Sequence, residues 1–505
     1  MRPRRLGNCQ SRKFPRPATH EIMTGRMLLY LTAGCLLTCL AHGTQPAIKV
    51  ILSEKGLQYV KEMGAEWLLQ NLGSASPPDV HGKLSLSLGT VYYSIMGMAV
   101  TYCEFAEPSV EFYEDVTGFK AVISGLYIQV KGAWSASYGI FEDGGAFELV
   151  IRDLEVDLLL GLGMDADGQP SFRCAACGAS VGSAGLNLID ASWIIEQFID
   201  EELIRSTIEE KICPMITERL DELEYRLAAL GATFQVNHLL AVDLPLTSYP
   251  VVNSSCLSLS LKGMFHRPDS PVDPPFEPQP FSLDGQPGYM LSLGLSEYTT
   301  NSASHAYFVS GSLQLLITDS MIPPSSPLHL NTNSFGPFVP KLPKMFPDME
   351  MQLQVFALEA PEFMFGSGVV RMDVHGAIKA FVVRPDGTFI FLFRLNLEST
   401  FSGKFRMANE KLTGAIALEN LYLTLDSSEV GEVQTDALKI AIKFGIKLSG
   451  LPRLNAKLAK GIDLPTMQHA HLTNLVLEVE EGFISVLSDA EIKLREAKVG
   501  TPWMV

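Results

Sequence analysis

Beyond its first forty residues, the sequence lacks an apolar run long enough to cross a membrane. A transmembrane helix needs about 18 or more consecutive apolar residues, and no such run follows Leu40. Hydrophobic residues nevertheless form 47% of the 505-residue chain, and the mean hydropathy is +0.17. Both values are high for a chain without a membrane span. We therefore expect additional apolar surface inside the protein.

Patterns that bind metals or phosphate are also missing. The ten histidines are scattered without metal-site spacing, and no glycine-rich loop is followed by Lys and then Ser or Thr. The run Asp165-Ala166-Asp167-Gly168 begins like a calcium loop but lacks the next oxygen ligand and the closing glutamate. We expect a polar hairpin turn there, and neither a metal nor a cofactor.

Basic residues are scarce in the first half of the chain. From Thr44 to His266, 29 Asp and Glu residues stand against 13 Lys and Arg residues, a net charge of −16 in a chain whose total is −17. The electrostatic field of this negative charge repels nucleic acids and anionic lipid surfaces within a Debye length of about 8 to 10 Å. Nucleic acid is therefore not expected as a partner.

The N-terminus has the order of a secretory signal peptide. An arginine-rich region precedes the apolar run Met27–Leu40, and Ala41-His42-Gly43 supplies small residues for cleavage. We predict a signal peptide over residues 1–43 and a secreted, extracellular protein that begins near Thr44. Met23 or Met27 as the true start, and an uncleaved anchor, remain alternatives.

Cleavage leaves an odd number of cysteines in an oxidising compartment. At least one thiol is then unpaired within the chain. The Cys174-x-x-Cys177 pair could be a redox motif or half of a zinc site, but a second such pair is missing, so we favour a structural disulfide. In a secreted chain, Asn253-Ser254-Ser255 is a glycosylation sequon. The five cysteines are Cys103, Cys174, Cys177, Cys213 and Cys256.

Proline density marks a boundary near the middle of the chain. Seven prolines lie between Arg267 and Gly288, a density that excludes helix and sheet and favours an extended linker. We predict an N-terminal domain over 44–266, a proline-rich linker over 267–288 and a C-terminal domain over 289–505.

The first half opens with an amphipathic helix, predicted over Ser53–Leu72 with Ser53 as its N-cap. A second helix is predicted over Trp193–Leu230, which Pro214 should kink or divide. Between them, apolar and polar residues alternate in long antiparallel strand candidates. The strand candidates are Leu84–Leu88, Tyr92–Phe105, Val110–Tyr113, Phe119–Val130 and Phe147–Leu160.

The second half repeats this order. It has a short apolar segment around Ala306–Leu316, then strands, then a helical stretch over Leu438–Leu458 that should break near Gly450-Leu451-Pro452. A faint echo supports duplication: Phe105-Ala106 with Pro108 and Phe112, beside Phe356-Ala357 with Pro361 and Phe365. The strand candidates are Met351–Leu358, Val369–Val383, Phe389–Leu397 and Leu412–Leu425, and a last strand carries Leu475, Leu477 and Val479.

One motif suggests catalysis. Gly178-Ala179-Ser180-Val181-Gly182 fits the GxSxG nucleophile elbow, and Asp190 and His238 follow Ser180 in chain order. An elbow needs a buried parallel strand before it, whereas this stretch reads as a loop. We therefore predict that the chain is not an enzyme.

Several landmarks together resemble the bactericidal/permeability-increasing protein family, which includes lipopolysaccharide-binding and lipid transfer proteins. They are Ile51-Leu52-Ser53-Glu54-Lys55-Gly56-Leu57, Cys174-x-x-Cys177, Cys213 on a long helix, the proline linker, Leu295-Ser296-Glu297-Tyr298, Asp319-Ser320-Met321-Ile322-Pro323 and Leu451-Pro452-Arg453-Leu454-Asn455-Ala456-Lys457-Leu458.

The resemblance implies an α+β fold. It is a two-domain boomerang in which each domain is a twisted antiparallel sheet wrapped around a long helix, with a central sheet between them. It also implies a disulfide between Cys177 and Cys213, and two apolar pockets that hold the acyl chains of phospholipids.

Combining the helical faces with this resemblance gives candidate lipid-binding residues. Core packing alone would produce the same apolar stripes, so that alternative stays open. The candidates are Leu57, Val60, Gly64, Trp67, Leu68, Ile195, Phe198 and Ile199.

The family's lipopolysaccharide-binding members carry clustered basic residues at the N-terminal tip, whereas the corresponding segments here, Asn71–Ser76 and Trp134–Asp143, contain no lysine. The leading hypothesis is therefore a secreted binder or carrier of phospholipid or a related acyl lipid, with lipoprotein or membrane surfaces as further partners. The alternatives are an innate-immunity protein that recognises a microbial lipid such as lipopolysaccharide, and a secreted lipase that uses Ser180.

Overall fold

The computed structural model describes residues 45–73, 76–77, 79–86, 89–192, 201–322, 324, 326, 328–463 and 470–492. The expected signal peptide, and residues 193–200 of the expected second helix, lie outside this set. Among the described helices, none combines the length and the apolar character that crossing a membrane requires.

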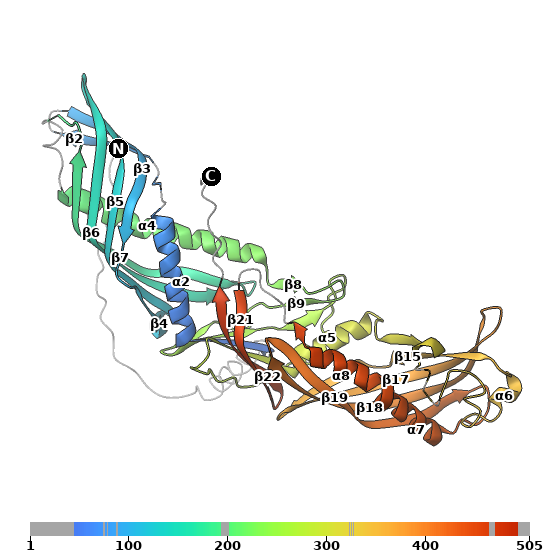
Figure 1. Ribbon diagram of the computed structural model, residues 1–505. Helices are drawn as coiled ribbons and strands as arrows, with labels where there is room; N and C mark the ends of the chain where they lie inside the picture. The colour runs from blue at the N-terminus through green and yellow to red at the C-terminus, as the bar shows by residue number, and fades with distance from the viewer. Residues whose placement is uncertain are drawn as a thin grey trace, which may run out of the picture. The chain divides into compact units, whose positions relative to one another are not determined.

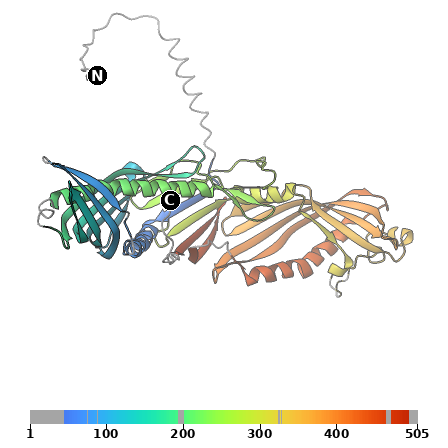
Figure 2. The ribbon, with the colours of Figure 1, turned by 90° about the horizontal axis from the view of Figure 1, so that it is seen from above.

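The first half contains an antiparallel sheet in the order β2-β3-β5-β6-β7, with β4 paired to β5. Helix α4 (Glu201–Leu230) packs against β7 at the edge of this sheet (Figures 1 and 2). The alternating apolar residues bury one sheet face, as their period of two requires. The strands are β2 (Val80–Leu86), β3 (Gly89–Glu104), β4 (Ser109–Tyr113), β5 (Gly118–Tyr138), β6 (Phe141–Met164) and β7 (Pro170–Leu188), with a 3-10 turn at Glu114–Val116.

The second half contains a sheet in the order β14-β15-β17-β18-β19-β20, with β16 paired to β17. Its largest core cluster includes Met351, Ile378, Phe393, Leu395 and Leu438. The helices are α5 (Glu297–Val309), α6 (Leu342–Met345), α7 (Thr435–Gly445), a π-helical turn at Ile446–Gly450, α8 (Leu451–Lys460) and a 3-10 turn at Asp319–Met321. The strands are β14 (Gln314–Ile317), β15 (Glu350–Ala357), β16 (Glu362–Gly366), β17 (Val369–Val383), β18 (Phe389–Ala408), β19 (Lys411–Ser428) and β20 (Ile462–Asp463).

The strand order of the first sheet recurs in the second, which adds β20 at its edge, and this supports the duplication seen in the sequence. In both, a short strand pairs with the third strand from the edge and lies off the main path: β4 on β5, and β16 on β17. Phe112 of β4 and Phe365 of β16, the two members of the sequence echo, pair with Phe119 and Val370 of those neighbours. Both phenylalanines are buried.

A central sheet joins the beginning, the middle and the end of the chain, as the resemblance implied. Its order is β10-β11-β1-β13-β22-β21, and every pairing is antiparallel. A smaller sheet, β12-β9-β8, accompanies it. The strands are β1 (Ile48–Ser53), β8 (Thr233–Gln235), β9 (Ala241–Asp243), β10 (Val251–Asn253), β11 (Cys256–Leu261), β12 (Met264–His266), β13 (Leu291–Ser296), β21 (Ala470–Glu480) and β22 (Phe483–Ile492).

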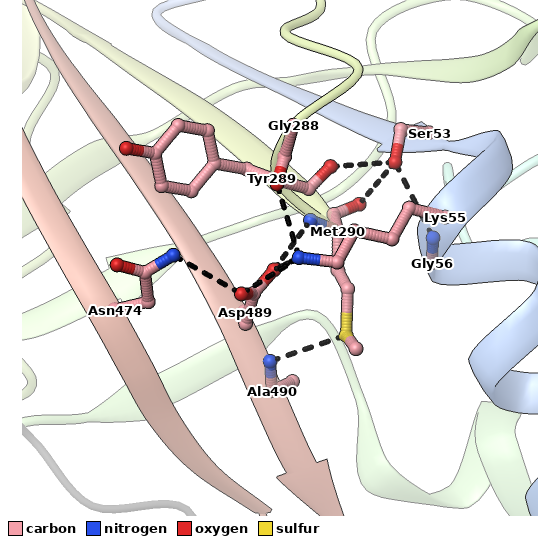
Figure 3. A network of polar contacts seen from close by, with 9 residues as sticks. All are labelled: Ser53, Lys55, Gly56, Gly288, Tyr289, Met290, Asn474, Asp489 and Ala490. Carbon is pink, nitrogen blue, oxygen red and sulfur yellow. Dashed lines mark hydrogen bonds and ion pairs between the residues drawn. The ribbon is translucent and has the colours of Figure 1, made fainter.

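The proline-rich segment 267–288 carries no helix or strand, apart from an isolated bridge between Arg267 and Ser270. Its end contacts the start of helix α2 (Glu54–Leu72), as Figure 3 shows: Ser53 Oγ donates to Tyr289 O at 2.6 Å, and Lys55 Nζ donates to Gly288 O at 3.0 Å. A Cβ on Gly56 would lie 2.7 Å from Met290 O, so this close approach requires a glycine.

One sequence expectation was wrong. The stretch around Ser180, read as a loop, lies within strand β7, because its alternating residues are Gly, Ala, Ser and Cys, whose small side chains give little hydrophobic signal. Helix α4 continues through Pro214 without division, and a kink at that residue, the other expectation, stays a prediction. A proline removes one helical hydrogen bond, and Ile212 and Ile216, packed on the sheet on either side of it, hold the helix together.

Candidate functional site

Helix α2 begins as its sequence predicts. The Ser53 hydroxyl accepts a hydrogen bond from Gly56 N at 3.3 Å and so caps the helix. One turn later, Leu57 is only 3% exposed and packs with Phe112 and Leu257. The first turn of the candidate stripe is therefore sealed core, and Leu57 has no free surface for a ligand.

Further along the same face, the helix is uncovered. The Val60 side chain is 48% exposed, and a Cβ built on Gly64 would meet no atom within 4 Å. Leu68 is half-buried. The apolar stripe thus changes from closed packing at Leu57 to an open apolar surface within two turns, which a ligand could cover.

The remaining candidates are not tested by the structure. The Trp67 side chain, and Ile195, Phe198 and Ile199, lie outside the described residues. Their place beside a lipid therefore stays a prediction.

Helix α4 is fixed to the sheet by apolar and polar contacts. Four isoleucines, one per turn, pack on a cluster that includes Leu154 and Val181 of β6 and β7. The partly buried Cys103 lies in the same cluster, and burial, with Glu104 nearby, raises the pKa of its thiol. The isoleucines are Ile204, Ile208, Ile212 and Ile216.

Polar side chains of α4 satisfy the backbone of β7, which is the edge strand. Glu209 Oε1 accepts from Val181 N at 2.7 Å, and Arg205 Nε donates to Val181 O at 2.9 Å. Glu201 Oε1 accepts from Ala184 N at 3.2 Å. These contacts protect an edge that would otherwise be open to pairing. Sequence reasoning missed them, because it read neither β7 as a strand nor these charges as its partners.

A disulfide between Cys177 and Cys213 ties β7 to α4, which confirms the pairing that the resemblance implied. Cys103, Cys174 and Cys256 are free thiols. The disulfide and the edge contacts together join α4 firmly to β7.

The GxSxG serine has no elbow geometry. Ser180 lies within the antiparallel strand β7, opposite Glu155 of β6, whereas a nucleophile elbow is a sharp strand-to-helix turn. The Asp165 run forms the expected polar turn, since Asp165 Oδ1 accepts from Asp167 N at 2.9 Å and Gln169 N at 2.7 Å. Among the described residues, no group of three or more metal-ligating side chains comes together.

A pocket of about 320 Å³ lies in the second half, where the end of α5 meets β14, β15 and β17. Lys379 Nζ stands 5.3 Å from the ring centre of Phe356 at its wall. The volume is at the lower end for small-molecule sites, and the mixed polar and apolar wall differs from a purely apolar lipid pocket. Sequence reasoning did not single it out. Its lining is Phe308, Gly311, Leu313, Gln314, Gln354, Phe356, Ala357 and Lys379.

The hairpin between β5 and β6 presents apolar rather than basic side chains. Ile140 is 93% exposed and Phe141 is 70% exposed. The next two residues, Glu142 and Asp143, are acidic. The turn of this hairpin, residues 138–143, contains no Lys or Arg to contact a polyanionic headgroup.

Comparison with known families identifies two matching models. The N-terminal domain of the LBP / BPI / CETP family matches residues 56–223, and the C-terminal domain of that family matches residues 234–493. Together they cover most of the described chain. The resemblance inferred from the sequence landmarks is confirmed.

Individual relatives match along nearly their whole length. The chain is 33% identical to "Bactericidal permeability-increasing protein" of Sebastes schlegelii, over 88% of this chain and 95% of that one. Identity to "Lipopolysaccharide-binding protein" of Homo sapiens is 28%, over 88% and 93%. For "BPI fold-containing family C protein" of Homo sapiens it is 24%, over 88% of both chains.

Among solved structures, the fold is similar to "Crystal structure of lipopolysaccharide binding protein". The TM-score is 0.52 at 24% identity, over 89% of this chain and 100% of that one. At this identity the likeness shows the fold alone.

Proposed function

The chain belongs to the LBP / BPI / CETP family, and from this premise we propose that it is a secreted, non-enzymatic binder or carrier of phospholipid or a similar acyl lipid. The observation that carries the proposal is the change along α2. Leu57 is sealed, while Val60 and Gly64 on the same face are open. The acyl chain of a lipid would cover this exposed apolar face of α2.

Burial of acyl chains supplies the binding energy without bond chemistry. Each methylene removed from water contributes about 0.8 kcal/mol, so two acyl chains give a large gross stabilisation even after ordering costs. No general acid or base is needed. The open stretch of α2 and the half-buried Leu68 provide the contacts on the helix side, and we propose that Trp67, Ile195, Phe198 and Ile199 continue them.

Secretion and glycosylation form part of the proposal. Asn253 is exposed at the end of β10, and its Oδ1 accepts from Ser255 N, in the turn that follows, at 2.9 Å. We place the domains at 44–266 and 289–505, with the linker at 267–288, after removal of residues 1–43.

Identification of bound lipid tests the proposal most directly. The protein is purified from the medium of secreting cells, its lipid is extracted, and the extract is identified by mass spectrometry. We expect phospholipid or a related acyl lipid in a fixed ratio to protein. A protein that carries no lipid, and takes up none when incubated with phospholipid, contradicts the proposal.

Recognition of a microbial lipid is the second candidate, favoured by the names of two relatives, lipopolysaccharide-binding protein and bactericidal permeability-increasing protein. The exposed Ile140 and Phe141, followed by two acidic residues, count against an electrostatic version of it. Capture by charge should weaken steeply with salt, whereas acyl-chain burial should not. Binding of monomeric lipid and of lipopolysaccharide at low and high salt separates the two candidates.

A lipase activity is the third hypothesis. The position of Ser180 within an antiparallel strand disfavours it. Labelling with a serine-reactive fluorophosphonate probe tests it. We expect the protein and its Ser180→Ala variant to remain equally unlabelled.

A further inference from the structure

The helical segment α7–α8 carries an uncovered apolar row. Ile440, Phe444 and Leu448 follow one another at four-residue steps, and their side chains are 69%, 51% and 54% exposed. Residues four apart lie on the same helix face. The opposite face carries the buried Leu438 and the half-buried Ile442, which pack into the second-half core. The helix is therefore apolar on two faces, of which the sheet covers only one.

A row of lysines runs beside this apolar row. Lys439, Lys443 and Lys447 each precede a member of the apolar row by one residue, so the lysine row runs parallel to the apolar row, about 100° around the helix axis from it. In α8, Arg453, Lys457 and Lys460 continue the positive charge. From Thr435 to Lys460, six Lys and Arg residues stand against one acidic residue, Asp436.

This segment reverses the charge of the rest of the chain. The whole chain has a net charge of −17, while residues 435–460 carry +5 from six basic residues and one acidic residue. Lys439 pairs with Asp436 at 3.1 Å. Within the described residues, no ion pair involves Lys443 or Lys447. Charges beyond a Debye length of about 8 to 10 Å are screened at physiological salt, so a surface at contact distance meets the local positive charge.

The helices lie on the outside of the second-half sheet. Figures 1 and 2 show α7 and α8 running along its side, and both contact β19. Asn455 fixes α8 to this strand, since its Oδ1 accepts from Ile416 N at 2.8 Å and its Nδ2 donates to Ile416 O at 3.0 Å. The exposed rows are therefore held in place by a buried face and a two-bond polar contact.

We propose that this docking face, formed by Ile440, Phe444 and Leu448 with Lys443 and Lys447, binds an anionic phospholipid surface. A helix with a basic flank and exposed Phe, Ile and Leu side chains lies in the plane of a membrane interface with its apolar side inserted. Each Lys or Arg near an anionic leaflet adds attraction. The inference goes beyond the carriage of single lipids, because a docking helix needs no internal pocket and a pocket needs no docking helix.

Vesicle sedimentation of the full-length secreted protein tests the docking face. The probes are vesicles of phosphatidylcholine alone and vesicles of phosphatidylcholine with phosphatidylserine. We expect binding to the second kind, weakened by high salt. In Lys443→Glu/Lys447→Glu, affinity should fall by about 25-fold or more, since each lysine near an anionic surface is worth about five-fold. In Ile440→Gln/Phe444→Gln it should fall by about ten-fold or more through lost insertion.

Matched controls test whether vesicle binding depends on this docking face or on surface charge and exposed apolar area in general. Lys404→Glu/Arg406→Glu makes the same charge change at two exposed residues of β18, and Tyr249→Gln/Val272→Gln removes two side chains that are 66% and 59% exposed. Both should bind as the original protein does. Thermal melting of every variant checks the fold, which outward substitutions should leave intact.

Two results would overturn the inference: no sedimentation with phosphatidylserine vesicles at low salt, or equal loss in the helix variants and the controls. If the docking face instead bound an acidic protein, the protein would not sediment with phosphatidylserine vesicles at low salt. Mass spectrometry of carried lipid in each variant keeps the two proposals apart. Helix-dependent docking by a protein without carried lipid contradicts only the carrier function, and carried lipid without docking contradicts only the docking face.

Discussion

Lys55 Nζ lies 2.7 Å from Asp489 Oδ1, which joins the first turn of α2 to the last strand of the central sheet across 434 positions of the chain. Asp489 also accepts from Met290 N at 3.0 Å and from Asn474 Nδ2 at 3.2 Å (Figure 3). One carboxylate therefore holds together the end of the proline-rich segment, the amphipathic helix and strands β21 and β22.

Asp489→Asn should lower the free energy of unfolding. The Asp489 side chain is 16% exposed and Lys55 is 41% exposed, so water screens part of the attraction, and we expect a loss of about 1 to 2 kcal/mol. Urea denaturation measures it. Asp436→Asn, which breaks the Lys439 pair at a 96% exposed aspartate, is the control and should change almost nothing. Equal effects of the two substitutions would contradict the role of Asp489.

The same aspartate predicts a dependence of stability on pH. Burial raises the Asp489 pKa, but hydrogen bonds from Lys55, Asn474 and Met290 outweigh it and leave the pKa below the ordinary value of 3.8. Its contribution is therefore fully present above that value and is lost as the pH falls through the lowered folded pKa. The stability gap between the original protein and Asp489→Asn should stay constant from neutral pH downward and then close under acid. A gap that widened on acidification would show the opposite shift.

Loss of the Cys177–Cys213 disulfide should destabilise the first half. The two cysteines are 36 positions apart, and a closed loop of this length contributes about 3 to 4 kcal/mol in the chain-entropy model. Cys177→Ser/Cys213→Ser should therefore melt well below the original protein. Cys256→Ser, at a free thiol, serves as the control. Non-reducing peptide mapping that joined Cys174 to Cys213 would refute the pairing.

Two leucines of α2 should respond differently to the same substitution. Leu57→Gln buries an unsatisfied amide in a closed cluster, and we expect a loss of about 3 kcal/mol or more of stability. Leu68 is half-buried on the open stretch, so the amide of Leu68→Gln can reach water. We expect that variant to lose carried lipid while the lipid-free protein melts almost as before. If Leu68→Gln kept its lipid and melted as low as Leu57→Gln, the residue would belong to the core.

The sequence alone was sufficient to predict several local structural features. Ser53 caps α2, and the long strands and the polar Asp165 turn follow from patterns a few residues long, because capping, period-two burial and turn bonds are decided by neighbours in the chain. The Cys177–Cys213 pairing came from family landmarks. Strand β7 was missed, since Gly, Ala and Ser carry too little apolar area for alternation to show.

Tertiary structure decided which part of each apolar stripe is covered. Leu57 and Val60 share one helical face, yet Leu57 is 3% exposed and Val60 is 48% exposed. Of these two residues, Phe112 and Leu257, from strands distant in the sequence, pack against Leu57 only. The sequence of α7 shows Leu438, Ile440, Ile442 and Phe444 as equally apolar, and packing against the sheet buries one pair and exposes the other. Periodicity within a helix states that a face is apolar, but contact with strands far away in the chain determines whether that face meets core, solvent or ligand.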